Sequence, residues 1–95
     1  MLIRSQDKSC ICNCEMMNTV GAIEVPQGTK ISMVHGDRLH DIGVYSSIQK
    51  ALKVLDMIEK EYLKYATIES DYNGVHSAFN MPKVFHMPAD EDVEV

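Results

Sequence analysis

The chain has 95 residues, and its nine Lys and Arg are outnumbered by fourteen Asp and Glu. A chain of this length forms one domain around one modest core, and an acidic balance argues against general binding to DNA or RNA, which needs clustered Lys and Arg against the phosphates. No apolar run reaches the roughly 20 residues that span a bilayer, and no basic stretch followed by an apolar stretch marks a signal peptide, so we expect no membrane partner and a cytoplasmic location.

The first half of the chain predicts a meander of short antiparallel strands. Leu2 and Ile3 open a strand, the polar residues 5–8 favour a tight turn, and the cysteine-rich residues 9–16 return as a second strand. Turn-forming residues then separate three further β-prone stretches, at 21–25, 30–35 and 39–45. Short strands at this close spacing are typical of an antiparallel sheet.

Residues 47–65 carry the pattern of an amphipathic helix. Ser46, with Gln49 three residues later, matches a capping box, in which each side chain bonds the backbone amide of the other residue. Apolar residues then recur at intervals of three and four and form one stripe: Ile48, Ala51, Leu52, Leu55, Ile58 and Tyr62. The expected fold is therefore α+β, an antiparallel sheet of four to six short strands with this one helix packed on one face.

The residues after the helix give two signals. Residues 67–80 hold Ser, Asp, Asn and Gly without a clear period, which predicts a loop. Residues 83–87 are β-prone and lie between Pro82 and Pro88. Because proline lacks a backbone donor, this strand is expected at the edge of a sheet.

The acidic excess belongs to the C-terminal end. Four of the fourteen acidic residues fall in the last six positions: Asp90, Glu91, Asp92 and Glu94. Without them the chain holds nine basic and ten acidic residues and is nearly neutral. The expected organisation is a single α+β domain over residues 1–88, followed by a frayed acidic tail over residues 89–95.

The stretch SCICNCEM, residues 9–16, places three cysteines at every second position. Side chains alternate between the two faces of a strand, so Cys10, Cys12 and Cys14 are expected on one face. Free cysteine behaves as a small hydrophobe and is among the most buried residue types. The favoured interpretation is that the thiols line the sheet surface under the helix, against Leu52 and Leu55.

A metal site at the cysteines is the less favoured alternative. Zinc takes four ligands in a tetrahedral cage, usually from knuckles that curl the backbone around the ion, whereas the outer thiols of a straight strand lie roughly 13–14 Å apart. A pair such as Cys12 and Cys14 with His35 or His40 remains possible, and so does redox sensing, although alternate residues of a strand are poorly placed for a disulfide. We expect no metal and no cofactor.

Catalytic motifs are not evident in the sequence. The four histidines, at positions 35, 40, 76 and 86, fall in no metalloprotease-like spacing. A nucleophile needs an oriented base beside it, and no nucleophile elbow, phosphate loop or pair of carboxylates is present. We therefore expect a protein without enzymatic activity and name no catalytic residue.

Two polar turns are candidates for binding an anion. Arg4 opens the first turn and Arg38 lies in the second, and an arginine at a strand end can grip a carboxylate or phosphate with two hydrogen bonds. If the turns converge, they form a small polar pocket; otherwise they are two solvated hairpin turns. The candidate ligand-binding residues are Arg4, Gln6, Lys8, His35, Arg38 and His86.

Three motifs resemble a family of small accessory proteins of temperate phages and related mobile elements of Gram-positive bacteria. They are RSQDK near the start, YSS with KALKVLDMI in the helix, and VFHMPADEDVEV at the end. The chain departs from the family pattern at His86, where glutamine is usual, at Ser47–Gln49 and in its cysteine run. Neither an activity nor a catalytic residue is carried over.

The resemblance implies a phage accessory gene, and many such genes encode antagonists of bacterial defence. The first hypothesis is a counter-defence protein, without enzymatic activity, that sequesters a nucleotide-derived immune signal as a homo-oligomer in the host cytoplasm. The second is a module that inhibits a host defence protein directly, through the acidic tail or the exposed strand edge near residues 84–87. The third is a small enzyme acting on nucleotides.

Overall fold

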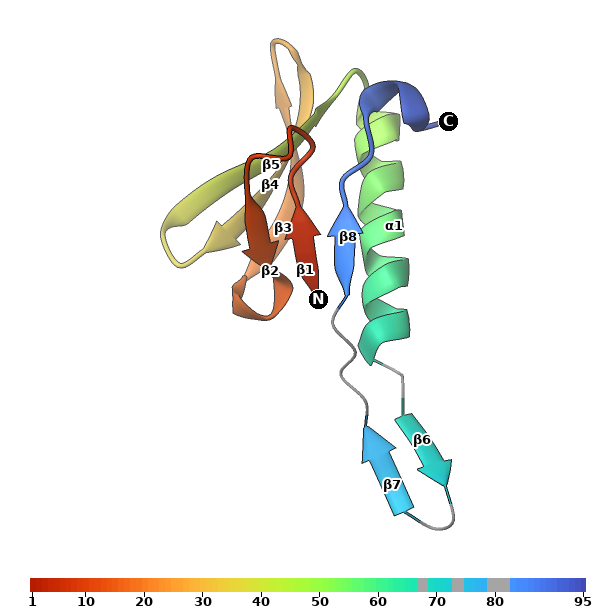
Figure 1. The fold of residues 1–95 in the computed structure, drawn as a ribbon. Coiled ribbons are helices and arrows are strands. Elements are labelled where there is room, and N and C mark those ends of the chain that lie inside the picture. The colour runs from red at the N-terminus through yellow and green to blue at the C-terminus, as the bar shows by residue number, and fades with distance from the viewer. Residues whose placement is uncertain (67–68, 73–74, 79–82) are drawn as a thin grey trace.

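The computed structural model describes residues 1–66, 69–72, 75–78 and 83–95, with side chains for residues 1–64 and 83–95. The described strands form two three-stranded sheets and one hairpin, and one long helix packs beside them (Figure 1). The α+β class is therefore confirmed. The expectation of a single sheet of four to six strands was wrong, because the second and third strands of the chain do not pair with each other.

The larger sheet is an antiparallel meander. Its strands, in spatial order, are β3 (Thr19–Val25), β4 (Gly28–His35) and β5 (Arg38–Tyr45). The turns hold two residues each, since Val25 pairs with Gly28 and His35 pairs with Arg38. Each of these three strands starts one or two residues before the stretch that the sequence predicted.

The smaller sheet joins the two ends of the chain. Its order is β2 (Ile11–Asn13), β1 (Leu2–Arg4) and β8 (Val84–His86). β1 runs antiparallel to β2 and parallel to β8. The predicted strand near residues 83–87 is thus confirmed, and it lies at an edge of this sheet.

The cysteine stretch is a strand only in its first part. A 3₁₀ helix, η1 (Cys14–Met16), follows β2, and the side chain of Asn13 caps it by accepting a hydrogen bond from the Glu15 amide at 3.0 Å. The strand alternation therefore ends before Cys14. As a result, the thiol of Cys14 does not point to the same face as the thiols of Cys10 and Cys12.

Helix α1 (Ile48–Ala66) begins one residue later than the sequence predicted. The hydroxyl oxygen of Ser47, and not that of Ser46, accepts a hydrogen bond from the Lys50 amide at 3.2 Å and so caps the helix. The Ser46 amide instead donates to the carboxylate of Asp90 at 2.7 Å. The C-terminal segment therefore supports the start of the helix.

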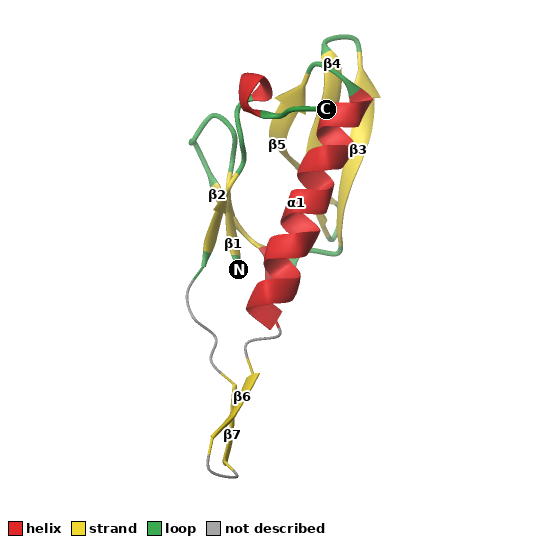
Figure 2. Ribbon diagram, turned by 90° about the vertical axis from the view of Figure 1, so that its right-hand side faces the viewer, coloured by secondary structure: helices red, strands yellow, loops and turns green. Residues whose placement is uncertain are grey.

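The buried side of α1 is rotated relative to the predicted stripe. Ala51, Val54 and Ile58 are buried, whereas Leu52 is 50% exposed and Tyr62 is 38% exposed. The helix packs against β3, β4 and β5 and lies along the open side between the two sheets (Figure 2). The prediction that one helix packs on a sheet holds, although Leu52 was wrongly assigned to its core face.

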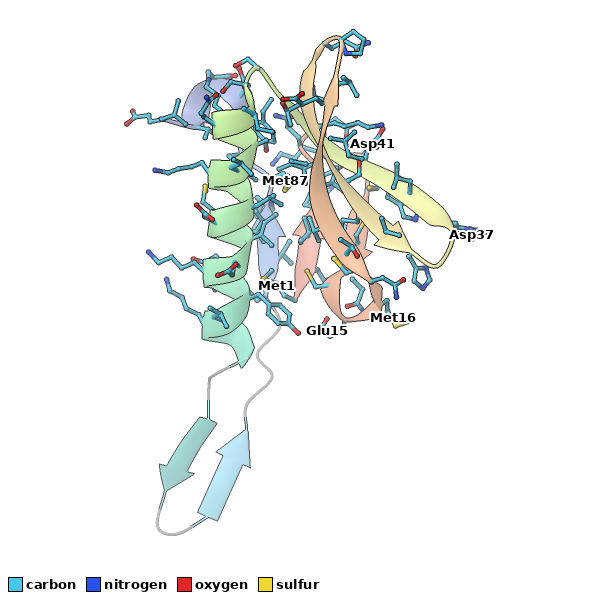
Figure 3. All side chains as sticks on the ribbon, turned by 180° about the vertical axis from the view of Figure 1, so that it is seen from behind. Met1, Glu15, Met16, Asp37, Asp41 and Met87 are labelled. Atoms are coloured by element: carbon cyan, nitrogen blue, oxygen red, sulfur yellow. The ribbon has the colours of Figure 1, made fainter. Side chains whose placement is uncertain are left out.

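The core fills the space between α1 and both sheets. Met87, the residue that follows β8 in the chain, points into this space (Figure 3). Asp37 lies far from it, at the tip of the β4–β5 hairpin. Val93 is only 5% exposed, so the prediction of a frayed C-terminal end was wrong for this residue and for Asp90. The largest fully buried side chains are Ile3, Ile31, Ile42, Tyr45, Val54 and Met87.

A second hairpin follows the helix. Its strands are β6 (Glu69–Tyr72) and β7 (Val75–Ala78), so the prediction of a loop over residues 67–80 was wrong there, and the rest of that range lies outside the described residues. Figures 1 and 2 show this hairpin extending beyond the C-terminal end of α1. No helix within the described ranges is long and apolar enough to cross a membrane.

Candidate functional site

The six ligand-binding candidates fall into two separate groups. Arg4 and His86 are register partners on β1 and β8, and His35 and Arg38 are register partners on β4 and β5. The two arginines therefore belong to different sheets. Three cavities of about 260, 400 and 230 Å³ lie in the described part of the chain, and neither arginine lines any of these three.

Arg4 keeps an unused hydrogen-bond donor. Ile3 points into the core, so the neighbouring Arg4 points to the outer face of the smaller sheet. One guanidinium nitrogen donates to the Lys8 carbonyl at 3.1 Å, whereas the buried Nε has no hydrogen-bond partner. Arg4 also takes part in none of the ion pairs among the described side chains. This cation is thus oriented without being neutralised.

The turn after β1 is fixed by Asp7. Its carboxylate accepts from the Ser5 hydroxyl at 2.7 Å, the Ser9 amide at 2.9 Å and the Ser9 hydroxyl at 2.6 Å. These hydrogen bonds, led by that of the Ser9 hydroxyl, lower the pKa of Asp7 to about 2. Lys8 adopts a left-handed conformation with φ of +69°, and its carbonyl is thereby held for Arg4.

Gln6 is a tertiary cross-link. Its side-chain oxygen accepts from the Val44 amide at 2.8 Å, and its nitrogen donates to the Pro88 carbonyl at 3.3 Å. Its own backbone amide donates to the Ile42 carbonyl at 2.8 Å. Both ends of this amide are therefore used within the fold, where they tie the first turn to β5 and to the segment that follows β8.

The outer face of the smaller sheet combines this cation with exposed apolar side chains. Leu2 is 38% exposed, Ile11 is 50% exposed and Val84 is 41% exposed. We call this surface the Arg4 face, and it consists of Leu2, Arg4, Ile11, Val84 and His86. Sequence reasoning missed it, because only the pairing of β1 with β8 brings the two chain ends together.

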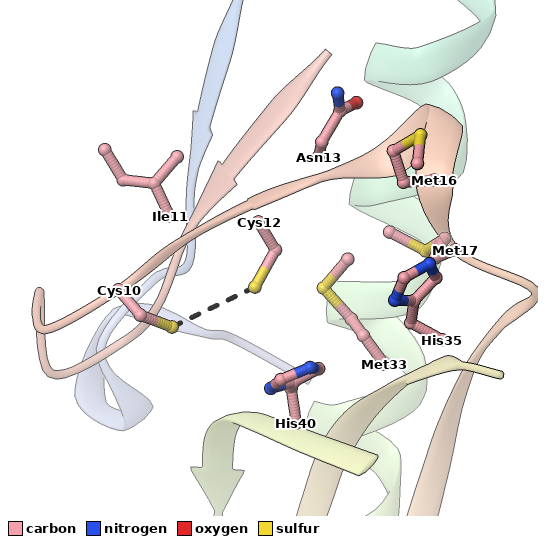
Figure 4. A pocket seen from close by; sticks show the side chains of 9 residues that line it. All are labelled: Cys10, Ile11, Cys12, Asn13, Met16, Met17, Met33, His35 and His40. Atoms are coloured by element: carbon pink, nitrogen blue, oxygen red, sulfur yellow. Dashed lines mark hydrogen bonds between the residues drawn. The ribbon is translucent and has the colours of Figure 1, made fainter. Parts of the chain in front are cut away.

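A cavity of about 260 Å³ lies between β2 and the larger sheet (Figure 4). The thiols of Cys10 and Cys12 are 3.9 Å apart at its wall. We call it the sulfur cavity, and its donor-bearing side chains include Cys10, Cys12, Met17, Met33, His35 and His40. Met33 and His35 lie two residues apart on β4, and this spacing alone indicates that they share one face of the strand.

The prediction for the thiols is therefore only partly right. Cys14 lines a different cavity, of about 400 Å³, together with Leu55 of the helix. Cys10 and Cys12 face β4 and β5 instead of α1, and Cys10 is exposed. The strand alternation was read correctly for these two, but the surface that they face was not.

Burial controls the ionisation of the inner thiols. It is the main cause that raises the pKa of Cys12 to about 11, and the adjacent Cys10 adds to the shift. Burial likewise raises the pKa of Cys14. Near neutral pH both groups are therefore thiols and not thiolates, and they are poor nucleophiles in this state.

A convergent site of hard or borderline ligands is not found in the part of the chain that the structure describes. No group of three or more His, Cys, Asp or Glu side chains there is placed to hold a metal ion. The side chain of His76 lies outside the described residues. The described geometry therefore offers no tetrahedral zinc cage of the usual kind.

Comparisons with family models, with curated protein sequences and with solved structures give no match for this chain. No relative therefore supplies an activity, a ligand or a partner. The functional argument starts from two places in the fold, the Arg4 face and the sulfur cavity.

Proposed function

We propose that this protein binds a small anionic, nucleotide-derived ligand on the Arg4 face, between two subunits of a homo-oligomer, without turning it over. Given the resemblance to phage accessory proteins, we further propose that the ligand is an immune signal and that the protein sequesters it in the host cytoplasm. The observation that carries the proposal is the oriented, unneutralised guanidinium of Arg4.

The chemistry of Arg4 favours a phosphate-bearing ligand. A guanidinium has five donors in a rigid fork and pairs with phosphate through two parallel hydrogen bonds. Arg4 gives the structure one hydrogen bond, to Lys8, and its buried Nε remains without a partner. His86 lies beside it on β8 and can supply a further donor.

The apolar part of the same face favours a second copy of the chain. Leu2, Ile11 and Val84 expose between 38% and 50% of their surface on one small sheet. Contiguous exposed apolar side chains of this kind mark interaction surfaces, and most homo-oligomers bring identical patches together around a two-fold axis. Two Arg4 side chains would then approach one ligand from opposite sides, in a site that excludes water.

Native mass spectrometry together with ligand-induced thermal shifts tests this proposal. The probes are cyclic mononucleotides, cyclic dinucleotides and adenosine diphosphate ribose, each added to the full chain. We expect an oligomer that binds at least one probe and releases it intact after heating. Chemical conversion of the bound probe would contradict sequestration and would favour the enzyme hypothesis.

Variants separate the two parts of the proposal. Arg4→Ala should abolish the ligand-induced shift while the oligomer persists, and Ile11→Asp should give monomers. Arg38→Ala is the matched control, because Arg38 lies in the other sheet and is expected to leave the shift unchanged. Loss of the shift in Arg38→Ala but not in Arg4→Ala would refute the Arg4 face.

Direct inhibition of a host protein is the second candidate, and one observation favours it. β8 ends the order of its sheet, so among the described residues one of its edges has no strand partner and could pair with a strand of another protein. The acidic segment can add charge attraction, since Glu91 and Glu94 are exposed. Deletion of residues 89–95 is a poor test, because it removes Val93 from the core; Glu91→Lys with Glu94→Lys keeps the fold and should weaken binding to a basic partner.

A further inference from the structure

The sulfur cavity is lined by soft donor atoms from three elements. Cys10 and Cys12 come from the β2 side, Met33 from β4, and His40 from β5. Figure 4 shows the sulfur atom of Met33 turned toward the thiol of Cys12. Neither the fold nor the proposed function of the Arg4 face gives this group of side chains a role.

The two thiols are spaced for a shared ion. Because Cys10 and Cys12 lie two residues apart, they point to the same face, and their sulfur atoms are 3.9 Å apart. An ion bound at the roughly 2.3 Å of a metal–thiolate bond would hold these sulfurs, 3.9 Å apart, at an angle of about 115°. That angle is trigonal, and it leaves one position open toward the interior of the cavity.

Met33 lines the same cavity as the two cysteines. Its side chain is 2% exposed, so it is held in place by the core. Figure 4 shows its thioether sulfur directed at the cysteine pair, with His40 below. The thioether is therefore the candidate for a third sulfur ligand.

The donor set selects one class of metal. Thiolate and thioether ligands favour monovalent copper, whereas carboxylates and carbonyls suit hard cations. Zinc needs four ligands of the His, Cys, Asp or Glu type, and no convergent group of even three is found among the described side chains. We propose that the sulfur cavity binds monovalent copper through the Cys10 and Cys12 thiolates and the Met33 thioether.

Binding is a proton-for-metal exchange without electron transfer. The two thiols release two protons, and the resulting bis-thiolate complex of Cu⁺ carries one negative charge. The strand register places Arg38 and His40 on the same face of the larger sheet as Met33. The positive charge of Arg38 therefore lies on the same side of the larger sheet as the negatively charged copper complex would.

Anaerobic competition tests the copper site. The full chain is titrated with Cu(I) in the presence of bathocuproine disulfonate, a chromophoric chelator. We expect one Cu(I) per chain and X-ray absorption dominated by sulfur scatterers. Cys10→Ser with Cys12→Ser should weaken Cu(I) binding at least a hundredfold, and Met33→Leu should weaken it about tenfold at the same stoichiometry.

Cys14→Ser is the matched control, because Cys14 faces the other cavity. It should bind Cu(I) as the unmodified chain does. Cys10→Ser alone checks that weaker Cu(I) binding in the double variant does not come from misfolding, since Cys10 is exposed and its replacement preserves the core. Undiminished binding in the double variant, loss of binding in Cys14→Ser, or stoichiometric zinc binding to these thiols without binding of Cu(I) would overturn the proposal.

Discussion

The hydroxyl of Tyr45 donates a hydrogen bond to the carbonyl oxygen of Pro88 at 2.8 Å. This contact joins the end of β5 to the segment that follows β8, and it lies at the point where both sheets and the start of α1 meet. Tyr45 is almost completely buried, and burial raises the pKa of its hydroxyl. The phenol therefore stays protonated and acts as a donor throughout the physiological pH range.

Tyr45→Phe isolates the energy of this contact. The aromatic ring keeps its packing, so the loss is that of one partly buried hydrogen bond, or about 1 kcal/mol in the free energy of unfolding. Urea denaturation followed by circular dichroism measures it. The Pro88 carbonyl still accepts from Gln6 at 3.3 Å, so a loss above about 3 kcal/mol would contradict this assignment.

The Asp7 turn makes stability depend on acid. Its hydrogen bonds lower the pKa of Asp7 in the folded protein to about 2, against an ordinary value of 3.8. A depressed pKa stabilises the folded state above the ordinary value, and this contribution is lost as the pH falls through the folded value. Asp7→Asn should therefore be less stable than the unmodified chain at pH 6, and the gap should narrow between about pH 4 and pH 2.

Ser9→Ala provides the companion measurement for the acid effect. It removes the strongest donor to Asp7, so the pKa of this carboxyl should return toward 3.8. The loss of stability in acid that Asp7 causes should then be complete at a higher pH in Ser9→Ala than in the unmodified chain. Urea midpoints measured across the acid range decide the matter, and identical pH profiles for the three proteins would refute the role of this turn.

The elements that local chemistry specifies were the ones that could be predicted. Three β-prone stretches separated by turn-forming residues located the meander, and apolar residues at intervals of three and four located the helix. The pairing of β1 with β8 could not be predicted in this way, because it joins residues 82 positions apart and leaves no local signal. The division into two sheets has a different cause, which is that β2 and β3 do not pair with each other.

In the candidate sites, too, single residues could be identified from the sequence, whereas their neighbours could not. Arg4 and His86 were both named from the sequence, but their adjacency depends on that long-range pairing. The thiol face was read from alternation, whereas its neighbours Met33 and His40 depend on how the two sheets pack. The chemistry of each residue can thus be inferred from the sequence, whereas the surface that it faces is set by tertiary contacts.

Val54 and Leu52 test which side of α1 packs on the sheets. Val54 is fully buried, so Val54→Ala should cost about 2 kcal/mol of unfolding free energy through lost contacts and a small cavity. Leu52 is half exposed, and Leu52→Ala should change stability by less than about 0.5 kcal/mol. Thermal or urea denaturation compares them, and the reverse order would restore the stripe predicted from the sequence.

The three thiols should differ in their rates of alkylation. Cys10 is exposed and should react first with iodoacetamide. Cys12 should react slowly near neutral pH, because its pKa is raised to about 11 and the thiolate is the reactive form. Its rate should increase as the pH rises toward 11. Peptide mass spectrometry of briefly labelled native protein measures the order, and equal rates for Cys10 and Cys12 would contradict the burial of the second thiol.

Gly28 and Gly21 form a matched pair for the geometry of the larger sheet. Gly28 has φ of +142°, a conformation that side chains rarely adopt, and a Cβ there would overlap the carbonyl oxygen of Tyr45. Gly28→Ala should therefore destabilise the protein by about 2 kcal/mol or more. Gly21 has open space at its Cβ position, so Gly21→Ala should be neutral or stabilising, by up to about 1 kcal/mol. Since β4 begins at Gly28 and carries Met33, a milder effect at Gly28 than at Gly21 would mean that β4 and β5 do not approach each other as described, and the wall of the sulfur cavity would have to be redrawn.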